Sequence, residues 1–296
     1  MSARSTFSLK DIKSIARSIS LIENEIDGYE DLLMKLRPSD AKIIGITGAP
    51  GAGKSSLADA LIGEMIDDGK RVAVLCVDPS SPFNKGALLG DRIRMSQWYN
   101  HPDVFIRSLS SKGSLGGLHP KIIEISDLMK NAGFDYVIIE TVGVGQSEVD
   151  IAALADITVV MLVPEGGDII QTMKSGLMEV ADIFVINKYD RPGAKNFYNS
   201  LQQMMVQISN KISKKIPVIK TVATTGEGLA ELYQNIIKWN FDDGSEQKTQ
   251  LLAEKIWSLI QHERMRDIDK EKMRKEIIEA ASQPGFNMYQ FAKKYI

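Results

Sequence analysis

The residues best suited to chemistry stand in one short run, Gly48-Ala49-Pro50-Gly51-Ala52-Gly53-Lys54-Ser55, with the spacing G-x-x-x-x-G-K-[ST]. Its glycines let the backbone curl so that successive N–H groups point at one anion. A helix beginning at Lys54 would add the positive end of its dipole. We therefore predict a phosphate-binding loop extending to Ser56, with Lys54 at the β- and γ-phosphates and the Ser55 hydroxyl at Mg²⁺. The alternative is a glycine-rich turn that happens to contain Lys-Ser.

A second motif, Asn187-Lys188-Tyr189-Asp190, follows the apolar run 183–186 and fits the pattern N-K-x-D. Asp190 can accept hydrogen bonds from the ring N–H and the amine of guanine. Adenine lacks this donor pair and would leave a buried carboxylate unpaired, at a cost of ~1–3 kcal/mol. The stem of Lys188 can cover the base plane, and Asn187 can tie loops together. We predict a site for GTP and GDP, although the tetrapeptide alone is also typical of a solvated loop.

A loop of small residues, 221–228, follows the last apolar run. Within it, Ala223, Thr224 and Thr225 are candidates to contact the base, because a backbone N–H there could reach the guanine oxygen. An ordinary strand-to-helix turn is the alternative for this loop when it is taken alone.

Carboxylates that follow apolar runs are the candidates for the metal. Glu140 follows the run 136–139 and can hold Mg²⁺ or its bound water, with a plain glycine-rich turn as the alternative. Asp78 ends the run 72–77 and could bind a metal-bound water or simply cap a turn. Asp91 is a candidate Mg²⁺ ligand or water-positioning group.

Two further stretches contain glycines that would permit movement. Gly143 can present its N–H to the γ-phosphate, and 144–147, which includes Gln146, can move when that phosphate leaves. The stretch 165–174 is predicted to be a third mobile loop. Its Lys174 could reach a phosphate or a partner's carboxylate, although residue types alone favour a solvated loop there.

Composition excludes several other classes of protein. The net charge of -2 and the pI of about 6.0 give no basic excess for binding nucleic acid. No apolar run approaches the roughly 20 residues that span a bilayer, so we expect no membrane segment. The single cysteine, Cys76, is expected to be a small buried hydrophobe, and a reducing, cytoplasmic location is the default. The three histidines lack the spacing of metal ligands and are expected to be structural.

Apolar runs alternate with helical patterns from residue 42 onward, and several runs are apolar throughout. This predicts an α/β fold with a doubly wound, mostly parallel sheet covered on both faces. The expected strands are Lys42–Thr47, Arg71–Val77, Val104–Leu109, Tyr136–Glu140, Ile157–Val163, Ile183–Asn187 and Pro217–Thr221, and the expected helices include Lys54–Asp68, His119–Asn131, Ala194–Lys214 and Glu227–Trp239.

Helical extensions are expected at both ends. Apolar residues recur every three or four positions over 8–36, which predicts a helix that Gly28 breaks in two. The domains are therefore predicted as a helical extension (1–40), a P-loop nucleotide hydrolase domain (41–240) and a C-terminal helical arm (241–296).

Together these motifs resemble one family, the accessory GTPases of methylmalonyl-CoA mutase and related cobalamin-dependent mutases, also known as arginine/ornithine transport ATPases. The resemblance covers about residues 15 to 240. Besides the two nucleotide motifs, it rests on residues 16–23, 77–81, 89–95, 140–148 and 167–171.

This resemblance implies Mg²⁺-dependent GTP hydrolysis coupled to delivery, protection or repair of the cobalamin of an acyl-CoA mutase. It implies a homodimer joined by the C-terminal arm, and a metal surrounded by Ser55, Asp91 and Glu140. The loop with Lys174 would be a switch that links partner binding to hydrolysis. Pro82-Phe83-Asn84-Lys85 and the residues after Arg264 depart from the family's pattern, which leaves the partner enzyme open.

Two other classes of function fit the sequence less well. A small-molecule kinase or transport-linked ATPase would need an acceptor site, for which the sequence offers no candidate, and the motif at 187–190 argues against ATP. A metallochaperone GTPase for nickel, cobalt or zinc often carries His-rich or Cys-x-x-Cys sites, whereas this chain has one cysteine and three scattered histidines.

Overall fold

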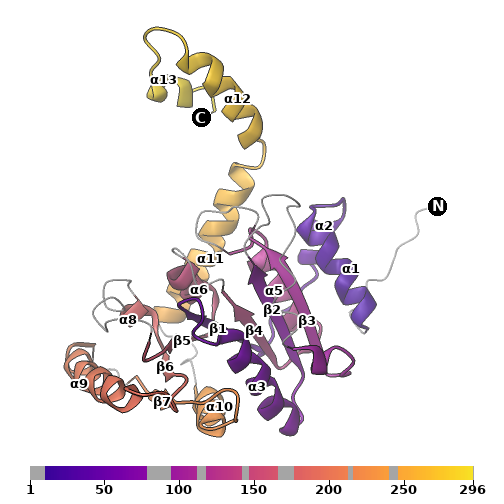
Figure 1. The fold of residues 1–296 in the computed structure, drawn as a ribbon. Helices are drawn as coiled ribbons and strands as arrows, with labels where there is room; N and C mark the ends of the chain where they lie inside the picture. Colours follow the sequence, from indigo (N-terminus) through magenta and orange to yellow (C-terminus); the bar gives the residue numbers. More distant parts are fainter. Residues whose placement is uncertain are drawn as a thin grey trace. The chain divides into compact units, whose positions relative to one another are not determined.

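A seven-stranded sheet forms the centre of the protein (Figure 1). The computed structural model describes residues 11–78, 95–111, 118–141, 147–165, 177–212, 216–239 and 246–295. The strand order is β3-β2-β4-β1-β5-β6-β7, and every neighbouring pair is parallel. The strands are β1 (Lys42–Gly48), β2 (Val72–Asp78), β3 (Val104–Ser110), β4 (Tyr136–Glu140), β5 (Ile157–Leu162), β6 (Ile183–Ile186) and β7 (Val218–Lys220). The predicted α/β fold and all seven predicted strands are confirmed.

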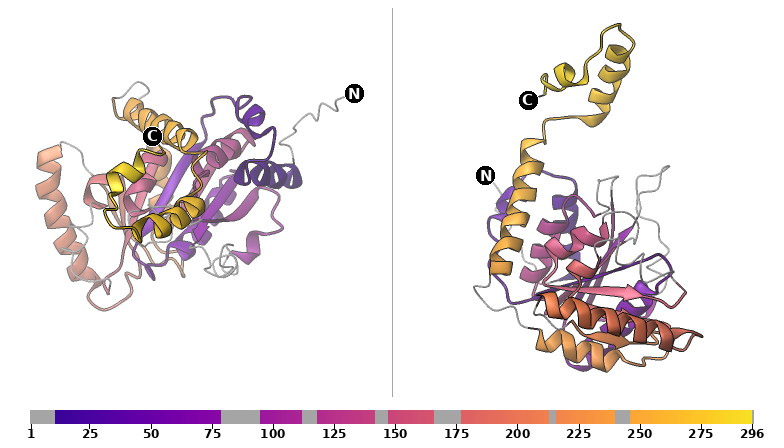
Figure 2. Two further views of the ribbon diagram at one scale, coloured as in Figure 1. Left: turned by 90° about the horizontal axis from the view of Figure 1, so that it is seen from above. Right: turned by 90° about the vertical axis from the view of Figure 1, so that its left-hand side faces the viewer.

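Helices cover both faces of this sheet, as Figures 1 and 2 show. Alternate side chains of β1 and β2 enter two different hydrophobic clusters, so the sheet has a core on each side. Burying each large side chain contributes ~1.5–3 kcal/mol, which is why the interiors of these strands are mostly apolar. The helices over the sheet are α3 (Lys54–Asp67), α5 (Ile122–Asn131), α6 (Ser147–Leu154), α8 (Leu177–Val180), α9 (Ala194–Ile212) and α10 (Leu229–Lys238).

The close packing of α6 on the sheet depends on a glycine in β1. A Cβ atom at Gly45 would lie 2.5 Å from the side chain of Ile151 and 3.0 Å from that of Ala155. Cys76 is buried in the same sheet, as predicted.

There are two N-terminal helices, α1 (Ile12–Glu23) and α2 (Tyr29–Leu33). Helix α1 packs on α5 through Ile15, Ile19 and Ile22, and α2 contacts α1. Gly28 separates them with a φ of 95°, in the left-handed region that glycine tolerates, so the predicted break is confirmed. The Asp11 carboxylate caps α1 by accepting a hydrogen bond from the Ser14 N–H at 2.8 Å.

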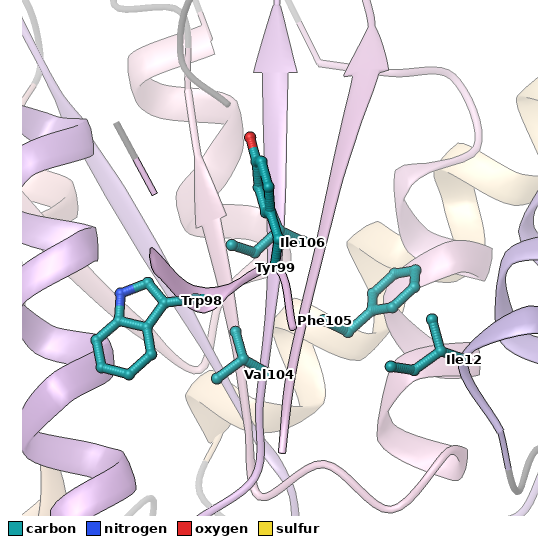
Figure 3. A pocket seen from close by; sticks show the side chains of 6 residues that line it. All are labelled: Ile12, Trp98, Tyr99, Val104, Phe105 and Ile106. Atoms are coloured by element: carbon teal, nitrogen blue, oxygen red, sulfur yellow. The ribbon is translucent and has the colours of Figure 1, made fainter. Parts of the chain in front are cut away.

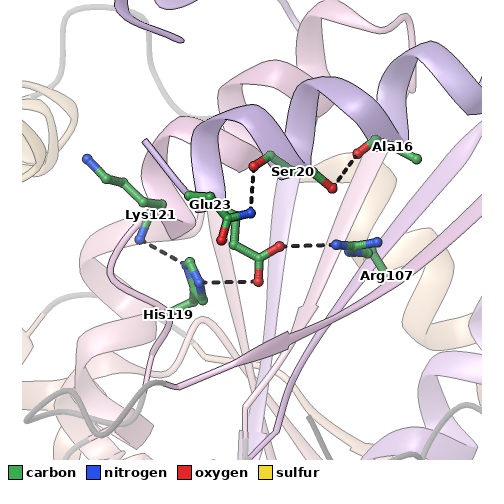
Figure 4. A network of polar contacts seen from close by, with 7 residues as sticks. Ala16, Ser20, Glu23, Arg107, His119 and Lys121 are labelled. Carbon is green, nitrogen blue, oxygen red and sulfur yellow. Dashed lines mark hydrogen bonds and ion pairs between the residues drawn. The ribbon is translucent and has the colours of Figure 1, made fainter. Parts of the chain in front are cut away.

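A polar network also holds these helices to β3 and α5 (Figure 4). The Glu23 carboxylate lies 3.1 Å from the Arg107 guanidinium and 3.8 Å from His119 Nε2. The Lys121 amine lies 2.8 Å from the carboxylate of Glu25, on the loop after α1. Burial disfavours its charged form, but the nearby carboxylates outweigh burial and raise the pKa of Lys121. His119 is fully buried and accepts a hydrogen bond from the Lys121 N–H at 3.0 Å, which fits the structural role expected for it.

The chain forms two compact units, Met1–Ser245 and Glu246–Ile296. The second contains α11 (Glu246–Arg264), α12 (Lys270–Ala281) and α13 (Met288–Ala292). The sequence pattern did not reveal α13, which Phe291 anchors by packing against Phe286 and Tyr295. Among the residues that the structure describes, none of the helices combines the length and apolar content needed to cross a bilayer.

Candidate nucleotide-binding and hydrolysis site

The candidate site lies along the carboxyl edge of the sheet, where all the parallel strands end. The register pairs Ile46 with Glu140 and Gly48 with Met161, so the phosphate-binding loop leaves β1 between the ends of β4 and β5. The chain order reverses direction across the sheet at β1, and ligands of open α/β sheets bind at such a point.

Gly48 and Lys54 shape the phosphate-binding loop. A Cβ atom at Gly48 would lie 2.3 Å from the Met161 carbonyl oxygen, so only glycine lets the loop pass this close to β5. The Lys54 side chain is buried, and its amine donates hydrogen bonds to the carbonyls of Gly48 at 2.8 Å and Ala49 at 3.3 Å. The cation therefore sits inside the curl of the loop, as the β- and γ-phosphate role requires.

The Ser55 hydroxyl donates a 2.6 Å hydrogen bond to the Glu140 carboxylate, and both side chains are buried. Asp78, also buried, ends β2 beside β4, with Cys76 in register with Glu140. Next to Glu140 in the chain, the Thr141 hydroxyl donates a hydrogen bond to the Thr47 hydroxyl at 3.1 Å. Among the described residues, the candidate metal ligands are therefore the Ser55 hydroxyl and the Glu140 and Asp78 carboxylates, all at the carboxyl edge of the sheet.

This donor set fits Mg²⁺. The ion prefers hard oxygen ligands, and it usually keeps water and substrate phosphates around one or two protein groups. No cluster of three histidine, cysteine, aspartate or glutamate side chains occurs among the described residues. Ser55 and Glu140 suit an ion that arrives with a nucleotide better than one held in an all-protein cage.

Asn187 joins the phosphate-binding loop to the loop after β7. Its side-chain N–H donates to the Ala52 carbonyl at 2.8 Å, and its side-chain oxygen accepts from the Ala223 N–H at 3.1 Å and the Thr221 hydroxyl at 3.2 Å. The Asn187 side chain is buried, so these bonds are shielded from water. One amide thus connects the two segments expected to hold the phosphates and the base.

The remaining base-contact candidates lie around this junction. Lys188 has a φ of 54°, and its amine is 3.6 Å from the Glu165 carboxylate. Asp190 is exposed in the turn after β6, and Thr224 and Thr225 are exposed in the loop after β7. The Tyr189 N–H donates to the Thr221 carbonyl at 3.1 Å, so the two loops are adjacent.

The structure therefore gathers most of the predicted site residues at one edge. Three of them, Asp91, Gln146 and Lys174, lie outside the described residues. Sequence reasoning missed Glu165 as the ion-pair partner of Lys188 and Arg191, and nothing in its neighbourhood in the sequence pointed to that contact.

A phosphate-binding loop on a parallel sheet, joined through an asparagine to an N-K-x-D loop, defines the class of P-loop GTPases. The family model described as "Methylmalonyl Co-A mutase-associated GTPase MeaB" matches residues 15–279. The chain belongs to this family, and it is a GTPase.

Related proteins support this family assignment. A Pyrococcus horikoshii protein named as a GTPase is 47% identical over 231 residues, covering 76% of this chain and 73% of the relative. The GTPase ArgK of Escherichia coli is 36% identical over 236 residues, covering 76% and 71%. The "Methylmalonic aciduria type A homolog, mitochondrial" of Caenorhabditis elegans is 45% identical over 148 residues, covering 50% of this chain and 37% of that protein.

A solved structure shares the fold. The crystal structure of an LAO/AO transport system kinase aligns with a TM-score of 0.63 at 23% identity, covering 96% of this chain and 92% of that chain. At this identity the likeness supports the architecture alone.

Proposed function

We propose that this GTPase hydrolyses GTP with Mg²⁺ and serves as a chaperone or regulator of a cobalamin-dependent acyl-CoA mutase such as methylmalonyl-CoA mutase. The family description names an association with that mutase. The name of the Caenorhabditis elegans relative points to the same metabolic context.

One observation carries the nucleotide part of this proposal. The Asn187 side chain spans from the Ala52 carbonyl to the Ala223 N–H, so the phosphate-binding loop and the base-reading loops meet within hydrogen-bond distance. Such an arrangement suits one ligand with phosphates at one end and guanine at the other. Had these segments been far apart, no single nucleotide could have bridged them.

Each group at the edge has a role in this proposal. Amides of the loop 48–53 orient the phosphates, and the buried Lys54 amine neutralises charge that develops in phosphoryl transfer. Ser55, Glu140 and Asp78 would hold Mg²⁺, which supplies charge neutralisation for the β- and γ-phosphates when bound. The proposal also includes Asp91, Gln146 and Lys174. These residues would position the attacking water, or supply the remaining charge at the phosphates when a partner binds.

We further propose a homodimer that uses the C-terminal unit. Its helix α11 exposes Leu252, Ile256, Leu259 and Ile260, at the spacing of one helical face. The cytoplasmic location stays a prediction from the sequence.

Nucleotide hydrolysis and mutase capture together test the proposal. We expect phosphate release from GTP over ATP, abolished by chelation of Mg²⁺, and slow without a partner. We also expect the protein to retain methylmalonyl-CoA mutase in a pull-down with a non-hydrolysable GTP analogue. ATP preference would contradict the guanine assignment. Phosphate transferred to an added amino acid would indicate a kinase, and tight nickel, cobalt or zinc binding would indicate a metallochaperone.

A further inference from the structure

The strand β3 lies at one edge of the sheet and has main-chain groups that face away from it. Among the described strands, β3 pairs with β2 alone. The Val72 N–H of β2 donates to the Asp103 carbonyl at 2.9 Å. Main-chain groups of successive residues point to opposite sides of a strand, so those of Ile106 and Ser108 face away from β2. The described residues supply no partner for these outward groups.

The length and composition of β3 make this edge suited to pairing with another strand. Natural sheets protect their edges with very short strands, prolines or unpaired charges. The opposite edge strand, β7, has three residues, whereas β3 has seven and contains no proline. The charged side chain of β3, Arg107, lies 3.1 Å from the Glu23 carboxylate of α1, as Figure 4 shows. The strand β3 therefore has none of these protections.

An apolar groove of about 270 Å³ lies at the same edge (Figure 3). Figure 3 shows Trp98 and Val104 on one side of the strand, and Phe105 and Ile12 on the other. Both Ile12 and Tyr99 expose 46% of their surface. Pockets for small molecules usually measure about 300–1,000 Å³, so this groove suits a few side chains better than a cofactor. The side chains that line it are Ile12, Trp98, Tyr99, Val104, Phe105 and Ile106.

Two cations of α1, Lys13 and Arg17, form a positive rim beside the groove residue Ile12. Both are exposed, and they share one face of the helix because they are four residues apart. The described residues give neither of them an ion-pair partner. The carboxylates next to groove residues in the sequence are already engaged: Asp11 caps α1, and Asp103 lies 3.5 Å from an arginine guanidinium. The positive rim is therefore available to acidic groups of a ligand.

We propose that the edge of β3 and its groove bind an extended segment of a partner protein, in which acidic residues flank apolar ones. The segment adds a strand to the sheet: its main chain pairs with the outward groups of Ile106 and Ser108, and its apolar side chains enter the groove. Its acidic residues meet Lys13 and Arg17. A second copy of β3 fits less well, because its charged residue, Arg107, is a cation. The inference uses none of the nucleotide residues, so it is tested separately from the proposed function.

Labelled peptides of defined composition test the proposal by fluorescence anisotropy with the full chain. The probe has a centre of valine and isoleucine and a pair of aspartates at each end. We expect saturable binding to the wild-type protein. Affinity should fall at least about tenfold when lysines replace the aspartates, and also when N-methylation removes the N–H groups of the centre. No saturable binding, or equal binding of either altered peptide, would overturn the inference.

Three variants of the protein test the edge, the groove and the rim in turn. Ser108→Pro removes an outward N–H and leaves the ladder to β2 intact, and the Ser108 hydroxyl has no hydrogen bond to lose among the described residues. It should weaken binding of the acidic peptide about three- to tenfold, the scale of one hydrogen bond. Ile12→Glu places a charge in the groove and should weaken binding at least about tenfold. Lys13→Glu should weaken binding of the acidic peptide and strengthen that of the lysine peptide.

Ile26→Glu and Lys195→Glu are matched controls, because they make the same changes at exposed positions outside the groove. Both should bind the peptide as the wild type does. Thermal unfolding and GDP affinity, which should be unchanged, show whether each variant is folded. If Ser108→Pro fails to fold, Ile12→Glu and Lys13→Glu still test the site, since both positions are exposed. Wild-type peptide affinity in a folded Ile12→Glu protein would overturn the inference. A wild-type dimer that Ile12→Glu dissociates would assign the edge to a second copy and would overturn it as well.

Discussion

Asn187 uses both ends of its side-chain amide, and each end satisfies a different loop. Replacing it by aspartate would set a carboxylate oxygen against the Ala52 carbonyl, at the place where an N–H now donates at 2.8 Å. Losing this bond inside a buried site costs ~1–3 kcal/mol, and the buried charge adds to the cost.

We therefore predict that Asn187→Asp lowers the melting temperature and weakens binding of GDP and GTP by at least about tenfold. Differential scanning fluorimetry and nucleotide titration would measure the two effects. Gln203→Glu makes the same chemical change on an exposed position of α9 and should have little effect. Unchanged affinity in a folded Asn187→Asp protein would contradict the role of this side chain as the link between loops.

Asp190 is the residue expected to select the base in the proposed site. Its carboxylate would accept hydrogen bonds from the N–H and amine of guanine, whereas an asparagine would present a donor at one of those positions. Xanthine carries a carbonyl where guanine carries the amine, so Asp190→Asn should favour xanthine nucleotides. We expect GTP affinity to fall by about a hundredfold and XTP affinity to rise, measured in parallel titrations. Asp190 is exposed, so the protein's melting temperature should not change. Equal loss for GTP and XTP would argue against direct base contact.

At the scale of elements, the start of α3 and the loop after β6 approach closely. A Cβ atom at Gly53, where φ is 94°, would lie 2.5 Å from the Asn187 side-chain nitrogen. Gly51 also has a positive φ, 78°, but a Cβ atom there would meet nothing within 4 Å. An alanine at either position would therefore strain the backbone, but only at position 53 would its Cβ atom also collide with the Asn187 side chain.

We predict that Gly53→Ala weakens GDP binding far more than Gly51→Ala does. Both variants should pay a backbone cost of ~1 kcal/mol, and Gly53→Ala alone displaces Asn187. Isothermal titration of both variants against the wild type gives the comparison. Similar affinities for the two variants would show that strain in the loop, not its contact with Asn187, decides binding.

The end of β5 is linked to the base-reading loop through Glu165. This carboxylate lies 3.6 Å from the Lys188 amine and 3.7 Å from the Arg191 guanidinium, and about half of its side chain is exposed. Exposed ion pairs contribute ~0–1 kcal/mol, and salt screens them. The pair nevertheless restrains Lys188, whose stem is expected to lie over the base.

Glu165→Gln should therefore weaken GDP binding by about twofold to fourfold at low salt, and the difference should vanish at high salt. A salt series of GDP titrations measures this. Glu227→Gln, which alters an exposed carboxylate in the loop after β7, serves as the control. A loss that persists at high salt would contradict an electrostatic restraint.

The elements themselves could be predicted because their signals are local. Runs such as 72–77 are apolar throughout since both faces of the sheet are covered, and the glycine at position 28 marks the break between α1 and α2. Contacts between distant segments left no such signal. The pairs Asp59–Trp98 and Glu23–Arg107 join residues 39 and 84 positions apart. They exist only because the short helix η1 (Ser96–Trp98) docks on α3 and α1 docks on β3.

At the scale of the whole molecule, the two units have different cores. The first has a sheet with buried side chains on both faces, and its last helix is secured where Lys42 donates to the Trp239 carbonyl at 2.7 Å. Burial lowers the pKa of the Lys42 amine, opposed by the Asp156 carboxylate. In the second unit, Phe291 is the one hydrophobic side chain that is buried among the residues whose burial is described. Most of the large apolar side chains described in that unit are therefore exposed and could contact another protein surface.

The exposed face of α11 is the surface on which the proposed dimer depends. Its four aliphatic residues each expose between 37% and 57% of their surface, and contiguous apolar patches on proteins usually mark association sites. Covering each of these side chains would contribute up to ~1.5–3 kcal/mol. Placing aspartates at Ile256 and Leu259 would put charges into such an interface and oppose association.

We predict that wild-type protein is dimeric at micromolar concentrations and that the double variant Ile256→Asp/Leu259→Asp is monomeric, as measured by light scattering after size exclusion. Gln250→Asp lies on the opposite side of the same helix and should stay dimeric. All three proteins should bind GDP with the same affinity, because the proposed nucleotide-binding residues belong to the first unit. A wild-type monomer, or a double variant that still dimerises, would place the association elsewhere and leave the face of α11 to a different partner.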